Sequence, residues 1–307
     1  MNHISSPAPT GADITFREPD RTGSIAGLSR RGFHRVAYVE WGDPAADRVA
    51  ICVHGLSRQG RDFDVLAAAM ADRGWRVICP DLVGRGRSGW LGNPDDYNLP
   101  QYAADMAALI ARSGATTVDW VGTSLGGLIG MVLAGQPNSP IGRLVINDIG
   151  PFLPWQALSR LASTVRNAPK VFPTLSAMEQ HLRTTLAPFG NLSDAEWHHL
   201  VEHGAVQEPG GAWRKRADPE ITAAFRPGLF FNLSLWTYWD AITCPTLVLR
   251  GETSDLLLPS TAKDMQRRGP EAELVEIPGC GHAPALMEPS QVSLITDWLD
   301  SVPPDRH

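Results

Sequence analysis

The sequence has few of the features that mark secreted, membrane or nucleic-acid-binding proteins. Its four cysteines, Cys52, Cys79, Cys244 and Cys280, are spread over 307 residues and do not resemble a disulfide framework. No apolar run approaches the length of a transmembrane helix, and residues 1–20 are polar without the apolar core of a signal peptide. The net charge is −6, with no basic cluster. We therefore expect a cytoplasmic protein with a poorly ordered N-terminal segment, and neither nucleic acid nor a membrane as partner.

The most informative stretch that is present surrounds Ser124. Val118, Trp120 and Val121 predict a short buried strand, residues 122–126 read Gly-Thr-Ser-Leu-Gly, and residues 128–133 are apolar with helical character. This G-x-S-x-G pattern between a strand and a helix is typical of a sharp turn that exposes the central serine. The alternative is a glycine-rich turn that only packs a helix on a sheet. The strand before and the helix after it favour the exposed nucleophile.

Short apolar runs alternate with helical segments along most of the chain. Strands are expected at 35–41, 49–53, 75–79, 118–121, 144–146, 246–249 and 274–277, and helices at 63–70, from Pro100 onward, at 128–133 and at 292–299. Continuous apolar runs are typical of parallel strands covered on both faces, whereas the alternation in 35–41 predicts an edge strand. The pattern predicts an α/β fold, with a mostly parallel twisted sheet between helices.

The segment 152–239 interrupts this alternation. It contains no convincing buried strand, and its helical patterns are separated by proline, glycine and charged clusters. We interpret it as a mostly helical cap inserted into a core formed by residues 21–151 and 240–307. The alternative is an ordinary helical subdomain whose aromatic residues form its own core.

Four segments in the right order make the chain resemble an α/β-hydrolase with a cap, from Arg35 to the end. They are residues 54–56 (His-Gly-Leu), 81–88 (Asp-Leu-Val-Gly-Arg-Gly-Arg-Ser), the elbow at 122–127, and residues 250–255 with 279–282. The Gly-Thr-Ser-Leu-Gly-Gly elbow resembles that of a bacterial carboxylesterase family. The resemblance implies the α/β-hydrolase fold and a serine hydrolase reaction without a cofactor.

The expected chemistry requires a base and an acid for the serine. Ser124 is the candidate nucleophile, His282 the base, and Asp255 the acid that orients the imidazole, in the chain order typical of this fold. Asp148, after the strand that follows the elbow, is the rival acid, and Glu252 is a weaker one. Two backbone donors are needed for the oxyanion. The Leu125 N–H is one, and the resemblance implies that Leu56 supplies the other while His54 braces the loop.

Two other motifs are rejected. Residues 84–89 fit the dinucleotide pattern G-x-G-x-x-G, but the following residues 90–94 cannot begin the helix that such a site requires. Residues 199–203 fit the zinc pattern H-x-x-E-H, but no segment offers a clear third ligand, and a solvated helix face is the simpler interpretation. We expect no metal.

The substrate is expected to be a small-molecule ester of short to medium chain length, bound under the cap. Hinge positions in the chain favour Trp155, Phe230, Phe231 and Trp236 as lining residues. Arg58 is a candidate for pairing with a substrate carboxylate, which would favour a lactonase or a C–C bond hydrolase; the alternative is an ion pair with Asp62 or Asp64. A non-catalytic ligand receptor on the same fold is the alternative from another functional class.

Overall fold

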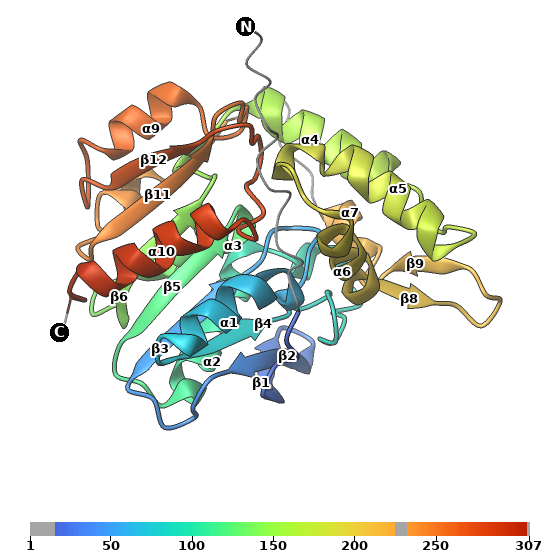
Figure 1. Ribbon diagram of the computed structural model, residues 1–307, viewed down its shortest axis with the longest axis horizontal. Coiled ribbons are helices and arrows are strands. Elements are labelled where there is room, and N and C mark those ends of the chain that lie inside the picture. Colours follow the sequence, from blue (N-terminus) through green and yellow to red (C-terminus); the bar gives the residue numbers. More distant parts are fainter. Residues whose placement is uncertain (1–15, 225–231, 306–307) are drawn as a thin grey trace, which may run out of the picture.

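The computed structural model describes residues 16–224 and 232–305, and its centre is an eight-stranded sheet (Figure 1). In spatial order the strands are β1 (Arg21–Ser29), β2 (Gly32–Trp41), β4 (Trp75–Pro80), β3 (Arg48–Val53), β5 (Val118–Thr123), β6 (Ile141–Asn147), β11 (Thr246–Gly251) and β12 (Glu273–Ile277). The pairs β1–β2 and β2–β4 are antiparallel, and all other neighbouring pairs in this sheet are parallel. The predicted α/β architecture with a mostly parallel sheet is confirmed.

Helices cover both faces of the sheet, as the continuous apolar runs predicted. On one face lie α1 (Asp64–Asp72) and α10 (Pro289–Ser301), and on the other lie α2 (Leu99–Ser113), α3 (Leu125–Ala134) and α9 (Pro259–Met265) (Figure 1). Trp41 and Trp75 are fully buried beneath the first group, and Trp120 beneath the second. Burying side chains of this size on both sides contributes several kcal/mol each, at roughly 25 cal/mol per Å² of apolar area, and makes the sheet a rigid support.

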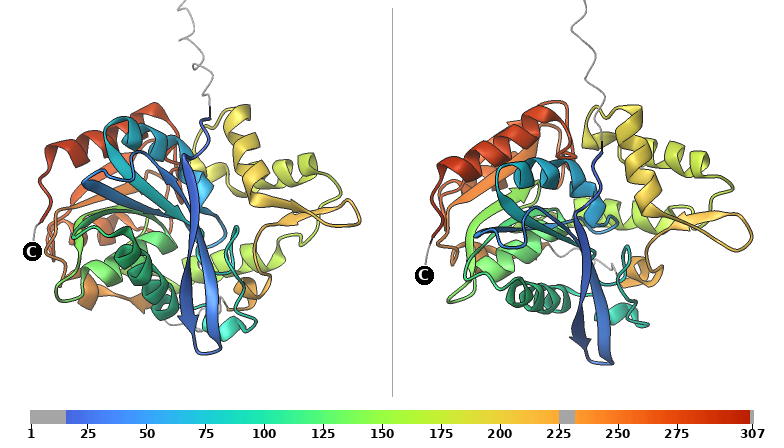
Figure 2. Two further views of the ribbon diagram at one scale, coloured as in Figure 1. Left: turned by 90° about the horizontal axis from the view of Figure 1, so that it is seen from below. Right: turned by 60° about the horizontal axis from the view of Figure 1, so that its bottom comes forward.

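Strand β1 was not expected and changes the interpretation of its neighbour. Its side chains alternate between exposed and partly exposed positions, because one face of this two-stranded extension meets solvent. Since β1 pairs with β2 along its whole length, β2 is not the edge strand that its alternation predicted. In Figure 2 the β1–β2 ribbon, in blue, lies in the foreground, and its hairpin end projects beyond the rest of the molecule.

Between β6 and β11 the chain leaves the sheet for residues 152–239, here called the insert. Its described elements are β7 (Phe152–Leu153), α4 (Trp155–Asn167), α5 (Leu175–Thr185), a 3₁₀ turn η3 (Ala187–Phe189), α6 (Asp194–Gly204), β8 (Ala205–Gln207), β9 (Trp213–Lys215), α7 (Glu220–Ala224), β10 (Leu233–Ser234) and α8 (Trp236–Trp239). The helices are as expected, whereas the antiparallel pairs β8–β9 and β7–β10 are not. The helices α4 to α6 and the β8–β9 hairpin gather on one side of the sheet in all three views (Figures 1 and 2).

Among the described residues, no helix combines the length and the apolar character that crossing a membrane would require.

Candidate active site

The turn between β5 and α3 holds Ser124 in a conformation that L-residues rarely adopt, with φ 51° and ψ −112°. Glycines make this turn possible because the chain passes very close to itself. A Cβ on Gly126 would lie 1.9 Å from the Val53 carbonyl oxygen, and one on Gly122 would lie 2.3 Å from the Gly126 carbonyl carbon. The turn therefore presents the serine side chain at the end of the sheet, as the G-x-S-x-G pattern predicted.

The side chains of Ser124, His282 and Asp148 form a continuous hydrogen-bonded row. The Ser124 Oγ lies 2.9 Å from His282 Nε2, and His282 Nδ1 lies 2.7 Å from Asp148 Oδ2. Asp148 is fully buried, and its carboxylate also accepts hydrogen bonds from the Gly251 N–H (2.7 Å) and the Ser254 hydroxyl (2.6 Å). These donors stabilise the ionised carboxylate that an imidazolium needs beside it.

The structure corrects the predicted acid. The Asp255 side chain is 53% exposed and forms an ion pair with Arg160 of the insert, 2.6 Å from its guanidinium, instead of contacting His282. The rival, Asp148, takes that place. Glu252 accepts a hydrogen bond from the Gly279 N–H (2.8 Å) in an exposed position and is also absent from this row.

The loop that carries Leu56 is held rigidly next to the elbow. A Cβ on Gly55 would lie 3.6 Å from the Ser124 Cβ, which places this loop against the nucleophile. His54 Nδ1 lies 2.7 Å from the Gly55 carbonyl oxygen, and its Nε2 accepts from the Leu82 N–H at 2.9 Å. Burial lowers the pKa of His54 to about 3, so the ring stays neutral and can serve as donor and acceptor at once. The expected bracing role of His54 agrees with this geometry.

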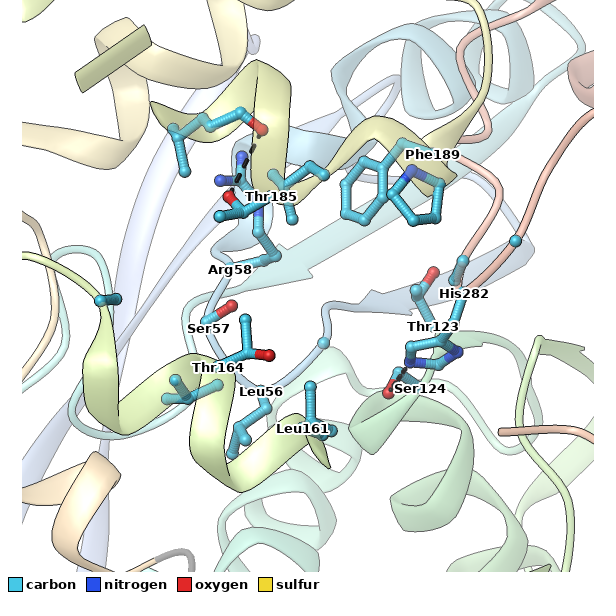
Figure 3. Close-up of a pocket in the computed structure, with 18 of the residues that line it drawn as sticks. Leu56, Ser57, Arg58, Thr123, Ser124, Leu161, Thr164, Thr185, Phe189 and His282 are labelled. Carbon is cyan, nitrogen blue, oxygen red and sulfur yellow. Dashed lines mark hydrogen bonds between the residues drawn. The ribbon is translucent and has the colours of Figure 1, made fainter. Parts of the chain in front are cut away.

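A cavity of about 480 Å³ opens above Ser124 and His282, between the sheet and the insert. In Figure 3, Ser124 and His282 point toward each other on one side of the cavity, and Arg58 lies on the opposite side. Its apolar wall comes mainly from α4, α5 and η3, through Leu161, Val165, Leu182, Leu186 and Phe189. Leu56 also lines it, and Leu125 begins α3, whose first N–H groups have no partner within the helix.

Of the five residues predicted to bind substrate, two lie elsewhere, two fall outside the described residues, and one lines the cavity. Trp155 begins α4 but does not line this cavity, and Trp236 has the guanidinium of Arg268 stacked over its ring at 4.1 Å. Phe230 and Phe231 lie outside the described residues. Arg58 does line the cavity, while its guanidinium donates to both carboxylate oxygens of Asp62 at 2.6 and 2.7 Å.

The sequence of this chain matches the family model described as "Alpha/beta hydrolase family" over residues 50–293. The chain belongs to the α/β-hydrolase family.

Its similarity to individual relatives extends over nearly the whole chain. It is 43% identical to a 3-hydroxybutyrate-oligomer hydrolase of Cupriavidus necator, over 91% of this chain and 97% of the relative. It is 26% identical to a 2-(acetamidomethylene)succinate hydrolase of Mesorhizobium japonicum, over 81% and 86% of the two chains. Among solved structures, a putative hydrolase from Rickettsia typhi has a TM-score of 0.85 and 30% identity, over 92% of this chain and 99% of that one.

Two basic residues at the site of this α/β-hydrolase, Arg85 and Lys215, were missed by the sequence analysis. Arg85 is fully buried and donates to the Leu56 carbonyl oxygen at 2.9 Å and to the Tyr102 hydroxyl at 2.8 Å, which fixes the loop beside the elbow. Its place within a glycine-rich loop was the available signal. Lys215 lines the cavity from β9, and no sequence pattern marks it.

The two rejected motifs have structural roles in this α/β-hydrolase. The loop of residues 84–89 contacts the insert through a Gly86 N–H to Arg216 carbonyl bond of 2.9 Å. His199 and His203 of α6 lie near Asp64 of α1, within the spacing of potential metal ligands. Asp64 is thus a third potential ligand, which the sequence did not reveal. Its Oδ2 pairs with Arg61 at 2.5 Å and with His199 at 3.2 Å, contacts that join α6 to α1, while its Oδ1 is buried without a partner among the described residues.

Proposed function

We propose that this chain is a serine esterase that hydrolyses short linear esters of hydroxycarboxylic acids, such as 3-hydroxybutyrate oligomers. The observation that carries the proposal is the hydrogen-bonded row Ser124–His282–Asp148 at the wall of a mostly apolar cavity. The 43% identity with a 3-hydroxybutyrate-oligomer hydrolase over almost the whole length supports the substrate class.

The proposed reaction proceeds through an acyl-enzyme. Asp148 fixes the tautomer of the neutral His282 imidazole, whose Nε2 takes the hydroxyl proton of Ser124 while Oγ attacks the ester carbonyl carbon, and Asp148 then stabilises the resulting imidazolium. The oxyanion accepts from the backbone N–H groups of Leu125 and Leu56. The C–O bond to the leaving alcohol then breaks, and His282 returns the proton to that oxygen. Water, deprotonated by His282, hydrolyses the acyl-enzyme and releases the acid.

The surroundings of the row favour an ester of limited size. The cavity of about 480 Å³ lies within the range of small-molecule sites, roughly 300–1,000 Å³. Among the described residues, the insert closes it with aliphatic side chains and Phe189, together with a few polar and charged side chains: Arg160, Thr164, His181, Thr185 and Lys215. We therefore assign the insert the role of a cap that buries a short acyl or alcohol group, and each buried methylene adds about 0.8 kcal/mol.

The test is hydrolysis of linear 3-hydroxybutyrate dimer and trimer by the purified chain, followed by chromatography of the products. Ser124→Ala is expected to keep the fold and to lower kcat by roughly 10⁴-fold or more. A fluorophosphonate is expected to label Ser124, with the adduct located by mass spectrometry, and Ser57→Ala in the same cavity is the control that stays labelled.

Other outcomes would contradict the proposal. An active Ser124→Ala variant or an adduct at another residue would exclude the serine mechanism. Labelling without turnover of any ester would favour a non-catalytic receptor. Turnover of lactones or of diketone acids in place of linear esters would mean that the same residues catalyse a lactonase or a C–C bond hydrolase reaction.

A further inference from the structure

A second cavity of about 410 Å³ adjoins the cavity at Ser124. The two share five lining residues: Leu56, Ser57, Val165, Ala168 and Lys215. Among the described residues, Lys215 is the only charged one in this shared wall. A linear molecule that extends from the elbow toward the second cavity would therefore pass the Lys215 side chain.

Lys215 has no counter-ion among the described residues. It ends β9, is partly buried, and its ammonium forms no hydrogen bond or ion pair with any residue that the structure describes. Burial, and secondarily the charge of Arg58, lower the pKa of Lys215 to about 8. The ammonium is therefore still mostly protonated at pH 7 but lacks the partner that a buried charge normally has.

The charged groups around Lys215 are already engaged elsewhere. In the first cavity, Arg58 is held by Asp62, and Asp255 by Arg160. His181, on α5, has its Nε2 buried without a partner among the described residues, and burial together with Lys215 lowers its pKa.

The second cavity offers Lys215 no free carboxylate in its buried part either. There Asp218 accepts from the Tyr97 hydroxyl at 2.5 Å, and Arg214 pairs with Glu208. Glu220 is exposed at the border of that cavity, and Arg166 and Lys170, also exposed, add positive charge to it. The wall between the two cavities thus carries one unneutralised positive charge.

We propose that Lys215 binds the free carboxylate of the substrate and thereby selects acid-terminated oligoesters, an inference that rests on the proposed function. A linear oligoester of a hydroxycarboxylic acid has one carboxylate, located in the alcohol part of its last ester bond. Arg58, whose charge acts on Lys215, lies across the cavity from Ser124 (Figure 3). The carboxylate is held at Lys215 by a charge-assisted hydrogen bond while the ester bond lies at Ser124.

The deciding measurement compares the 3-hydroxybutyrate dimer with its methyl ester, which differ only in the terminal charge. The wild type is expected to favour the free acid in kcat/KM by tenfold or more, mainly through KM. Lys215→Met is expected to abolish most of this preference, and Lys215→Arg to restore it. Lys263→Met, an exposed lysine of α9, is the matched control that retains the wild-type ratio.

The pH dependence provides a readout that a structural role would not produce. Because deprotonated Lys215 cannot bind a carboxylate, the preference for the acid is expected to decline as the pH rises through about 8. The substrate carboxylate stays ionised in this range, so it contributes no inflection. The inflection is expected to be absent in Lys215→Arg.

The outcomes separate the inference from the proposed function. The inference would be overturned by equal wild-type kcat/KM values for the acid and its methyl ester, or by a preference for the acid that Lys215→Met leaves intact. Neither result would contradict the proposed esterase function. Failure to hydrolyse either compound would overturn the esterase instead. In that case the inference is tested by calorimetry of 3-hydroxybutyrate and of its methyl ester, each binding to Ser124→Ala. A carboxylate site at Lys215 requires that the acid bind more tightly than the methyl ester, and that this difference disappear in Ser124→Ala/Lys215→Met.

Discussion

Asp148 and Asp255 differ in what surrounds their carboxylates. Asp148 is fully buried, accepts from Gly251 and Ser254, and lies 2.7 Å from His282. Asp255 lines the cavity but is half-exposed, so its pair with Arg160 is screened by water and contributes little, about 0–1 kcal/mol. Only the first environment can both orient an imidazole and stabilise its charge.

We predict that Asp148→Asn lowers kcat for p-nitrophenyl butyrate by about 10³- to 10⁴-fold, because the amide favours the wrong imidazole tautomer and removes the stabilising charge. Asp255→Asn is expected to change kcat by less than about threefold, at the cost of a surface ion pair. Steady-state kinetics on both variants, with circular dichroism to verify folding, provide the measurement. If the two effects were reversed, Asp255 and not Asp148 would be the acid that orients His282.

The sequence predicted Ser124, His282 and Asp255, and the structure brings the first two together but places Asp148 where Asp255 was expected. Both aspartates follow a strand, and chain order does not encode which way a side chain points. Asp148 adopts a positive φ of 56°, which turns its carboxylate toward the His282 loop, and an aspartate in that conformation has no local sequence mark. The lack of a counter-ion at Lys215 was equally unpredictable, because it depends on residues from separate elements.

At the scale of elements, the contact between α3 and β3 sets the position of the nucleophile. The helix approaches so closely that the Gly126 Cα faces the Val53 carbonyl without space for a methyl group. A backbone carbonyl in a central strand cannot move aside as a flexible side chain can. The elbow therefore depends on the exact approach of two elements, not only on the serine.

We predict that Gly126→Ala displaces α3 and lowers both stability and activity, with a loss of several kcal/mol typical of a backbone clash in a packed core. Gly210→Ala is the control, because a Cβ at that exposed position meets no atom within 4 Å. Urea unfolding of the two variants measures the difference. A Gly126→Ala variant as stable as Gly210→Ala would show that α3 can shift without cost.

Elements with both faces covered were predictable from sequence, and elements with little burial were not. The strands β3 to β6 are mostly apolar because helices cover them on both sides, and the buried charges of Asp119 in β5 and Arg143 in β6 pair with each other. Strand β1 and the three-residue strands β8 and β9 bury too little to leave a pattern. The prediction that Trp155 and Trp236 line the cavity was wrong for a related reason, because the docking of the insert on the core decides which of its helix faces meet the site.

Across the whole molecule, the insert is joined to the loops of the site by backbone hydrogen bonds. The Gly281 N–H donates to the Pro188 carbonyl at 2.7 Å, and the Ala285 N–H to the Phe189 carbonyl at 3.1 Å, on either side of His282. On the other side of the site, the Asp218 N–H donates to the Gly84 carbonyl at 2.7 Å. The insert thus positions the His282 loop as well as closing the cavity.

The hydrogen bond between Ser254 and Asp148 joins the two parts of the core that the insert separates in sequence, and it has an evolutionary consequence. Ser254 Oγ lies 2.6 Å from the same carboxylate oxygen that contacts His282. We predict that the exchange Asp148→Ser/Ser254→Asp recovers at least tenfold in kcat over Asp148→Ser alone, measured with p-nitrophenyl butyrate. No recovery would mean that position 254 cannot reach the imidazole. With recovery, a lineage of such enzymes could move the catalytic aspartate from one half of the gene to the other through two amino-acid substitutions, without any rearrangement of the backbone.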